Sequence, residues 1–270
     1  MMKSTAKWYY PWLEDEIICE VMGRVVAKST TPTGEVVAMK VCHRNILLQS
    51  EADMLQHVTQ HSSVKAPKLH RVYEVDSARV METDFVPGVP LDTVWGSFGA
   101  ETKAAIASQL REQVLAMRTS TQSFIGRVDF QPTFDIYLPL QNKSCGAFLT
   151  ECEFDAHKVQ LLEADSRKDK ADLLSGMLSK LRTNPTTFVL THGDLNPWNI
   201  HVQDTGSGWQ ICGILDWERS GFLPEYAEYT IAMTNPSHDE EWRKVLTEQV
   251  LVSCSKERVE AERLATRTFL

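Results

Sequence analysis

One stretch of the sequence, residues 192–217, limits what this chain can fold into more than any other. Residues 199–204 alternate between polar and apolar side chains, and residues 209–215 form a second, mainly apolar run. The four residues between the two runs, 205–208, read Thr-Gly-Ser-Gly, which is typical of a tight turn. Two such runs joined by a short turn predict a β-hairpin whose open ends lie side by side.

Three polar residues stand at the open end of this hairpin. Asp194 and Asn199 come before the first strand, and Asp216 follows the second strand directly. Pairing across the turn predicts that Asn199 lies opposite Ile214, with Asp216 on the diagonal at roughly 7–8 Å. The loop that enters the hairpin carries Asp194 to the same end. We therefore expect the three side chains to share one site.

These side chains are of the kinds that phosphoryl transfer requires. A carboxylate such as Asp194 can accept the proton of an attacking hydroxyl group, while Asn199 and Asp216 offer the hard oxygen ligands that magnesium prefers. Each aspartate on its own is more often a cap or a strand-end residue. The hypothesis of a phosphoryl-transfer site therefore rests on the spacing of all three.

Composition argues against several other classes of protein. The chain has 270 residues, of which 43% are hydrophobic and 24% are charged, as in a globular protein with room for two lobes. Its net charge of -8 argues against a nucleic-acid partner. It shows neither an apolar signal segment nor a run of roughly eighteen apolar residues, so we expect no membrane span and a cytoplasmic location.

The cysteine pattern carries no metal or disulfide signature. The six cysteines stand at positions 19, 42, 145, 152, 212 and 254, without a Cys-x-x-Cys pair. Most of them lie in apolar runs. We therefore expect reduced core cysteines in a reducing compartment, and neither a disulfide framework nor a zinc site.

The first 85 residues predict a small domain built on strands. Alternating apolar residues indicate strands, and apolar residues three or four positions apart indicate a helix. We expect strands at residues 16–22, 24–28, 35–42, 68–74 and 78–82, and a helix from Ile46 to Val58. Because Val86–Pro90 interrupts the pattern, we expect one domain at residues 1–85 and a second at residues 86–270.

The second domain is expected to be mainly helical. Amphipathic spacing predicts helices at residues 102–118, 171–181 and 238–269. A short buried strand is expected at residues 188–190, and residues 121–150 read as an irregular connection.

Two motifs give the chain a family resemblance. Residues 192–200 read His-Gly-Asp-Leu-x-Pro-x-Asn-Ile, and residues 214–218 read Ile-Leu-Asp-Trp-Glu. Together they resemble the aminoglycoside phosphotransferase, or choline kinase-like, family over roughly residues 20–250. The Asp-Trp-Glu form and the Pro-Glu-Tyr of residues 224–226 resemble fungal members of that family.

The resemblance implies a fold, a reaction and the cofactors of that reaction. The fold would be α+β and two-lobed like a protein kinase, with a small N-terminal antiparallel-sheet lobe and a larger, mainly helical C-terminal lobe. The protein would be an ATP-dependent phosphotransferase that uses ATP and Mg2+ and has an alcohol group as acceptor. By motif, Asp194 resembles the catalytic base, and Asn199 and Asp216 resemble the magnesium ligands.

The resemblance also implies nucleotide-binding residues in the first domain. Residues 36–40 read Val-Val-Ala-Met-Lys and are similar to the strand that carries the phosphate-binding lysine of kinases. Lys40 is therefore expected to contact the α- and β-phosphates, unless it is a solvated strand-end lysine. Glu51, on the following helix, is the candidate partner of Lys40, with Asp53 as the alternative.

Two further segments are assigned to the nucleotide site. Gly23 stands where protein kinases carry a glycine-rich loop, but a single glycine fits a plain turn equally well. Residues 81–85 are expected to form the hinge, whose backbone binds adenine in the family. Glu82 and Asp84 are therefore included among the expected nucleotide-binding residues.

Three features favour a small-molecule acceptor over a protein. Gly193 stands in place of the arginine of the protein-kinase His-Arg-Asp motif, and Asn196 stands in place of the catalytic-loop lysine. Only eight residues separate Asp216 from Glu225, which leaves no room for an activation loop. We therefore expect a small acceptor that bears a hydroxyl group, such as a cationic metabolite or antibiotic.

Four side chains near the motifs are candidates for contact with this acceptor. Trp198 and Trp217 flank the site, and each either walls the acceptor pocket or belongs to the core. Glu218 and Glu225, like Glu228 nearby, either bind an ammonium group of the acceptor or lie on a solvated helix start.

A second hypothesis is a catalytically inactive, kinase-like nucleotide-binding or scaffold protein. The single Gly23 in place of a glycine-rich loop favours it, and the complete set of Asp194, Asn199 and Asp216 opposes it. His192 is expected to brace the backbone rather than to act as an acid or base. The oligomeric state is not indicated by the sequence.

Overall fold

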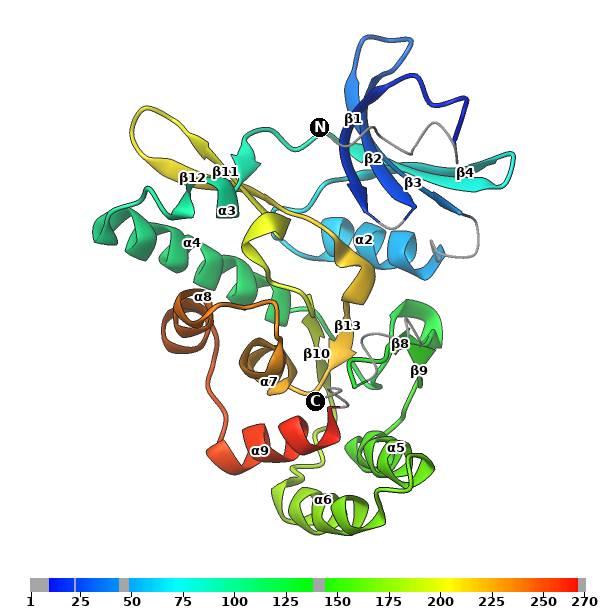
Figure 1. Ribbon diagram of the computed structural model, residues 1–270, viewed down its shortest axis with the longest axis vertical. Coiled ribbons are helices and arrows are strands. Elements are labelled where there is room, and N and C mark those ends of the chain that lie inside the picture. Colours follow the sequence, from blue (N-terminus) through cyan, green and yellow to red (C-terminus); the bar gives the residue numbers. More distant parts are fainter. Residues whose placement is uncertain (1–9, 22, 44–48, 138–143, 267–270) are drawn as a thin grey trace.

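The computed structural model describes residues 10–21, 23–43, 49–137 and 144–266. It has the two lobes that the resemblance implies, with a small antiparallel-sheet lobe above a larger, mainly helical lobe (Figure 1). The domain boundary at residue 85 stays a prediction, although the last strand of the small lobe ends at Asp84.

Five antiparallel strands form the sheet of the N-terminal lobe, in the order β1-β2-β3-β5-β4. Their bounds are β1 Glu16–Val21, β2 Arg24–Thr30, β3 Val36–His43, β4 Leu69–Val75 and β5 Ala78–Asp84. One helix, α2 (Gln49–His61), packs against this sheet. These elements lie close to the predicted positions, and the predicted helix start at Ile46 lies outside the described residues.

The alternation of side chains along β3 decides which of its residues face α2. Met39 and Val41 are buried on one face of the sheet together with Tyr10. Cys42 belongs instead to the core that includes α2 and continues into the larger lobe. Because successive residues of a strand point to opposite faces, Lys40 shares the face of Cys42 and points toward α2.

Two small sheets in the larger lobe position the loops of the site. Their orders are β13-β10-β7 and β12-β11-β6. The bounds are β6 Val89–Pro90, β7 Thr121–Gln122, β10 Phe188–Thr191, β11 Ile200–Asp204, β12 Trp209–Ile214 and β13 Gly221–Leu223. The predicted buried strand at residues 188–190 is thus the central strand of one of these sheets.

The predicted hairpin is present as β11 and β12, but its register differs from the prediction. Pairing starts at the turn as expected, and an irregularity between His201 and Val202 then shifts it by one residue. Ile200, rather than Asn199, therefore lies opposite Ile214. A bulge of this kind leaves no signal in the alternation of so short a strand.

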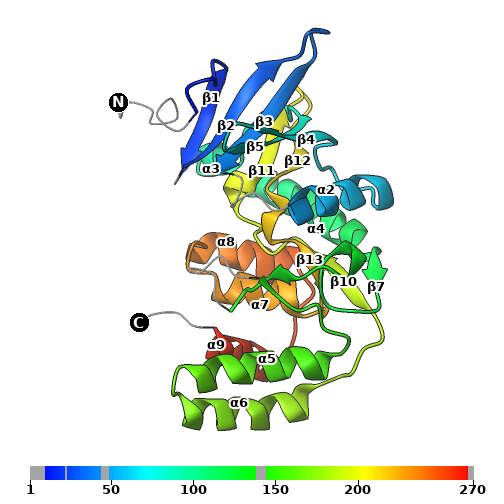
Figure 2. The same ribbon diagram turned by 90° about the vertical axis from the view of Figure 1, so that its right-hand side faces the viewer.

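Helices surround these sheets and extend the larger lobe away from the N-terminal sheet. The bounds are α3 Asp92–Trp95, α4 Ala100–Arg118, α5 Glu151–Ala164, α6 Lys168–Leu181, α7 Ala227–Thr234, α8 Glu240–Lys244 and α9 Lys256–Ala265. Helices α5 and α6 lie side by side at the end farthest from the sheet, as the turned view in Figure 2 also shows. The single helix predicted at residues 238–269 is wrong, because α8 and a π-helical turn at Val245–Val250 end before α9 begins.

Helix α5 was not predicted, because much of its buried side is charged. Its buried residues include Glu151, Asp155 and Lys158, so apolar residues do not recur at helical spacing. These charges are paired within the lobe. Lys158 lies 2.9 Å from Glu262, and Arg258 lies 3.2 Å from Glu151. Such pairs offset part of the desolvation cost that a buried charge carries.

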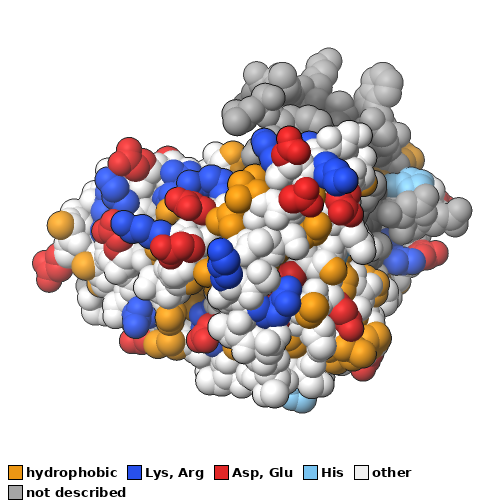
Figure 3. Space-filling model, turned by 90° about the horizontal axis from the view of Figure 1, so that it is seen from below, with side chains coloured by type: hydrophobic (Ala, Val, Ile, Leu, Met, Phe, Trp, Pro, Cys, Tyr) orange, Lys and Arg blue, Asp and Glu red, His pale blue; other side chains and the backbone are white. Residues whose placement is uncertain are grey.

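Two observations concern membrane-spanning helices and the distribution of charge on the surface. Within the described part of the chain, no helix combines the length and the apolar character that a membrane span needs. On the face of the molecule shown in Figure 3, acidic and basic side chains are interspersed rather than separated into patches of one sign.

Candidate active site

The loop that follows β10 is braced by His192. The backbone N–H of Asp194 donates to Nδ1 of His192 at 3.2 Å, and Nε2 of His192 donates to the carbonyl of Leu215 at 3.0 Å. Burial lowers the pKa of His192 to about 4, so its ring is neutral at physiological pH. His192 therefore ties the loop of Asp194 to the segment before Asp216, as the sequence suggests.

A second buried group, the carboxylate of Glu228, holds the same loop. It accepts hydrogen bonds from the backbone N–H of His192 at 2.7 Å and from that of Gly193 at 3.1 Å. Burial raises the pKa of Glu228 to about 7, although both N–H groups favour its charged form. Glu228 thus supports the loop, and it is not free to bind an ammonium group of an acceptor.

Gly193 is required in this loop by its conformation and by its surroundings. Its φ is +79°, and a Cβ there would lie 2.8 Å from the backbone oxygen of Arg219. We expect Gly193→Ala to lower the free energy of unfolding by about 2 kcal/mol and to reduce turnover. The matched control is Gly206→Ala, where φ is also +79° but no atom lies within 4 Å. Equal losses of stability in denaturant unfolding of the two variants would contradict the steric argument.

Two side-chain amides hold the carboxylate of Asp194. Asn196 Nδ2 donates to Oδ1, while Asn199 Nδ2 donates to Oδ2 at 3.3 Å and to the backbone oxygen of Asp194 at 3.0 Å. Burial, followed by the negative charges of Asp216 and Glu218, raises the pKa of Asp194 to about 6. At neutral pH this carboxylate is charged, yet it is a stronger base than an ordinary aspartate.

Asp216 lies at the end of β12 in the left-handed region, with φ 62° and ψ 69°. Residues other than glycine seldom adopt this conformation, and those that do are concentrated at functional sites. Its Oδ1 lies 2.9 Å from Nζ of Lys40. Burial alone would raise the pKa of Asp216, but the Lys40 ammonium outweighs burial and lowers it. Asp216 is therefore charged at neutral pH.

Three carboxylates surround the ammonium group of Lys40. Its Nζ lies 2.7 Å from Glu51, 2.9 Å from Asp216 and 3.3 Å from Glu218. Burial opposes the charge of Lys40, but the carboxylates overcome this and raise its pKa above the usual range. The expected pair of Lys40 and Glu51 is thus present, whereas Asp53 accepts hydrogen bonds from two glutamines.

The structure places Glu218 beside Arg24 and Lys40, which differs from its expected place beside an acceptor. Its carboxylate lies 2.6 Å from Arg24 and 3.3 Å from Lys40. Arg24 is the first residue of β2, so this ion pair joins the N-terminal sheet to the larger lobe. Nothing in the local sequence pattern marks Arg24, an arginine that follows a turn glycine.

The remaining acceptor candidates differ in their exposure. Trp217 is 2% exposed and its Nε1 donates to the carbonyl of Ile214 at 3.0 Å, so it is a core residue and does not wall a pocket. Trp198 is 45% exposed beside the active-site loop and stays a candidate. Glu225 is also exposed and stays a candidate, with its backbone carbonyl accepting a hydrogen bond from Arg118.

The expected hinge carboxylates are engaged with β4. Glu82 lies 2.9 Å from Arg71, and Asp84 lies 2.7 Å from His70. Both carboxylates thus have partners on β4, and nucleotide binding by this segment stays a prediction. Gly23 has φ +74° and no atom within 4 Å of its Cβ position, and its contact with a nucleotide stays a prediction.

Arg127 is a second residue that the sequence did not indicate. It is 2% exposed and reaches from the irregular connection to three partners. Its guanidinium donates to the carbonyls of Glu218 and Ser220, the latter at 3.0 Å, and to Oγ of Ser50 at 2.7 Å. Arg127 therefore fixes the segment after Asp216 against the start of α2.

The donors of Asn199 and Asp216 suit a magnesium ion. Magnesium prefers hard oxygen ligands, and it takes few of them from the protein when a substrate supplies phosphate oxygens. Asp216 offers a charged carboxylate. Asn199 uses its amide N–H on Asp194, which leaves its amide oxygen for a cation.

Known proteins show the same fold. A model of the phosphotransferase enzyme family matches residues 23–261. No curated protein matches the chain. A thermostable mutant of aminoglycoside phosphotransferase APH(4)-Ia in its apo form has a TM-score of 0.64 at 16% identity, over 97% of this chain and 88% of that one. A further structure of that enzyme is a ternary complex with AMP-PNP and hygromycin B.

Two other solved structures are similar. The streptomycin–ATP complex of APH(2'')-IIa has a TM-score of 0.56 at 14% identity, over 98% of this chain and 87% of that one. Macrolide 2'-phosphotransferase MphH from Brachybacterium faecium, as apoenzyme, has a TM-score of 0.51 at 15% identity, over 93% of this chain and 81% of that one. At such identities the likeness shows the fold alone.

Proposed function

This chain belongs to the phosphotransferase enzyme family, and we propose that it transfers the γ-phosphoryl group of ATP to a hydroxyl group of a small molecule. The observation that carries the proposal is the ion pair of Lys40 with Asp216, at the end of the hairpin that also places Asp194 and Asn199. Similar structures that hold a nucleotide together with an aminoglycoside support ATP as donor and a cationic antibiotic or metabolite as acceptor.

In the proposed reaction, Asp194 receives the proton of the acceptor hydroxyl as its oxygen attacks the γ-phosphorus. The bond from that phosphorus to the β–γ bridging oxygen breaks, and ADP leaves with the bonding electrons. Asn196 and Asn199 hold the carboxylate in one orientation, which favours proton transfer. Asn199 and Asp216 would hold Mg2+, which when bound neutralises charge on the β- and γ-phosphates.

We infer that Arg24 makes the phosphate contact that a glycine-rich loop makes in protein kinases. Arg24 and Lys40 both contact the carboxylate of Glu218. A triphosphate carries more negative charge than one carboxylate and competes with it for both cations. The planar guanidinium of arginine is suited to such phosphate oxygens.

Removing Arg24 is expected to weaken ATP binding more than it slows turnover. Arg24→Ala should raise KM for ATP about tenfold, because one charge-assisted contact with phosphate is lost. Steady-state kinetics at varied ATP measures this. Arg79→Ala is the matched control, since it removes an arginine paired at 2.7 Å with Glu74 in the same sheet. An unchanged KM in Arg24→Ala would contradict the inference.

The pH dependence follows from the pKa of Asp194, which is about 6 in the free protein. Below that pH the carboxylate is protonated and cannot accept the hydroxyl proton, so activity falls as pH falls. The value of kcat/KM for the acceptor should be about tenfold below its plateau at pH 5. If kcat/KM instead fell with a midpoint near pH 7, and this fall disappeared in Glu228→Gln, the titrating group would be Glu228.

The proposed function is tested by an ADP-release screen over amino alcohols, sugars and aminoglycosides. We expect ADP release that requires both Mg2+ and an acceptor, together with an acceptor whose mass rises by one phosphoryl group. Magnesium-dependent ATP binding without turnover across the whole screen would favour the inactive, nucleotide-binding alternative. The intact set of Asp194, Asn199 and Asp216 opposes that alternative.

We also propose a cytoplasmic location. All six cysteines are free, as is usual in a reducing compartment. Fractionation of cells that express the full chain tests this location, and recovery in a secreted or membrane fraction would contradict it.

A further inference from the structure

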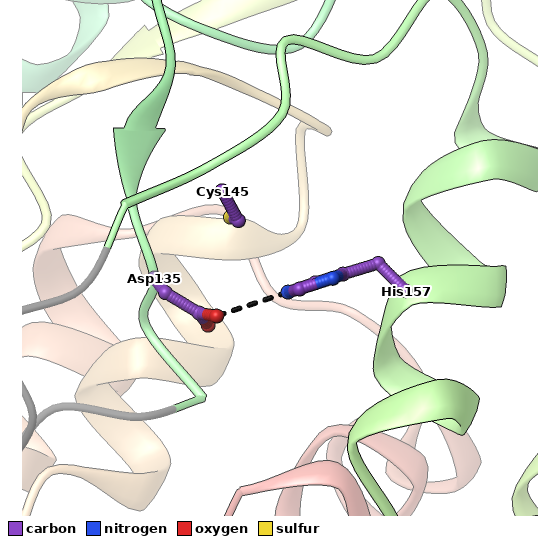
Figure 4. A group of neighbouring side chains, drawn as sticks. All are labelled: Asp135, Cys145 and His157. Carbon is purple, nitrogen blue, oxygen red and sulfur yellow. Dashed lines mark hydrogen bonds and ion pairs between the residues drawn. The ribbon is translucent and has the colours of Figure 1, made fainter. Parts of the chain in front are cut away.

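Three residues with metal-binding side chains converge in the larger lobe, on elements that the proposed reaction does not use. Asp135 directly follows β8 (Thr133–Phe134), Cys145 ends β9 (Ser144–Cys145), and His157 lies in α5. One donor atom of each residue lies within 4.8 Å of the other two. In Figure 4 the Asp135 carboxylate and the His157 ring point toward each other, with the Cys145 side chain beside them.

Local structure holds the three side chains in place. The pairing of Thr133 with Cys145 joins β8 to β9 and brings Cys145 close to Asp135. The backbone N–H of Tyr137 donates to Oδ1 of Asp135 at 3.0 Å, so Oδ2 is the oxygen that meets Nε2 of His157 at 2.9 Å. A carboxylate oriented by a backbone N–H in this way is typical of a pre-formed metal ligand.

The burial of these residues suits a bound cation. Asp135 is 1% exposed and Cys145 is 7% exposed, so a carboxylate and a thiol are removed from water together. Among the described residues, Asp135 contacts the backbone N–H of Tyr137 and the His157 ring. Burial and the nearby Asp135 charge raise the pKa of the Cys145 thiol, while the Lys158 ammonium acts in the opposite direction.

The donor set identifies the chemical class of the ion. A sulfur, an imidazole nitrogen and a carboxylate oxygen together suit zinc and cobalt, whereas magnesium and calcium prefer oxygen alone. In a tetrahedral zinc site the donors lie roughly 3.3–3.8 Å apart, so small side-chain movements are sufficient here. The side chain of His157 is 21% exposed, and a water molecule would supply the fourth ligand.

We propose, contrary to the expectation from the cysteine pattern, that Asp135, Cys145 and His157 bind one zinc ion, which ties the β8–β9 pair to α5. The thiol of Cys145 gives its proton to solvent as the zinc–sulfur bond forms. The ring proton of His157 moves from Nε2 to Nδ1, so that Nε2 becomes a ligand. The site is separate from the phosphoryl-transfer site, and the proposal does not depend on the reaction proposed above.

The test uses the full chain, freed of metal with a chelator and titrated with Co2+. We expect one Co2+ per chain and a near-ultraviolet band from thiolate-to-cobalt charge transfer. Zinc should displace the cobalt and abolish the band, and an excess of Mg2+ should leave it unchanged. Zinc should also raise the temperature of thermal unfolding.

Variants distinguish cobalt binding at this site from cobalt binding at the other thiols of the chain. Cys145→Ser should abolish the charge-transfer band and weaken cobalt binding about 100-fold. The control is Cys152→Ser, which changes an exposed thiol on α5, the helix that carries His157, and should keep the band. His157→Ala truncates a partly exposed helical side chain and gives a second variant that is expected to fold. Absence of a band in the wild-type chain, or a band that survives Cys145→Ser, would overturn the proposal.

Discussion

Replacing Asp194 with alanine is expected to lower kcat about 10³-fold, because the variant lacks the group that receives the hydroxyl proton. ATP affinity should change little, since Lys40, Asp216 and Arg24 keep their places. Single-turnover ADP release and calorimetric titration with ATP measure the two quantities separately. A loss of kcat without a loss of binding is the signature of a group that acts in the transition state.

Two controls make the Asp194 result specific. Asp172→Ala changes an exposed aspartate on α6 and should leave kcat and ATP binding unchanged. Thermal unfolding of Asp194→Ala should show that the loop still folds, because His192 and Glu228 hold it through backbone groups. Turnover of Asp194→Ala within tenfold of wild type would refute the assignment of Asp194 as the base.

Replacing Lys40 with alanine is expected to lower kcat/KM for ATP about 10³-fold. The variant removes the cation that neutralises phosphate charge, and it leaves Glu51, Asp216 and Glu218 facing one another without a counter-charge. Lys40→Arg should restore only part of the activity, because a planar guanidinium does not replace a compact ammonium group between three carboxylates. Initial rates at varied ATP concentration measure both variants.

The control for Lys40 is Lys28→Ala on the neighbouring strand. Lys28 lies 3.9 Å from Glu16, and both side chains are well exposed, so this pair contributes little. Its removal should leave the kinetics of ATP unchanged. If Lys40→Ala bound and turned over ATP normally, Lys40 would be a structural residue that only holds Glu51 and Asp216 together.

Elements with clear periodicity could be predicted from the sequence, and elements with charged interiors could not. Strand β3 follows from alternation, and alternation also places Lys40 on the face toward α2. Helix α5 buries Glu151 and Lys158 in ion pairs with residues of α9, so its pattern resembles a solvated segment. The one-residue shift in the β11–β12 hairpin depends on a bulge, which alternation does not register.

The residues of the candidate site also fall into two groups, those that the sequence could locate and those that it could not. Asp194, Asn199 and Asp216 could be located because a single hairpin brings them together, and their spacing is a local property of the sequence. The placement of Glu218 beside Arg24 and Lys40 could not be predicted from the sequence. These contacts join residues that lie 194 and 178 positions apart and belong to different lobes. The burial of Trp217 likewise depends on the packing of the core around it.

The sequence by itself determined the family and the location of its motifs, because those motifs are short runs of residues, and the two-lobed fold followed from the resemblance to that family. Only the tertiary structure decided that Arg24 and Lys40 share one carboxylate, that Glu228 supports a loop, and that Asp135, Cys145 and His157 meet. The spacing of residues along the sequence does not predict that last group, since its members come from three separate elements that only the folded lobe brings together. The physical reason is that the folded chain sets the distances between side chains, and separation along the sequence does not.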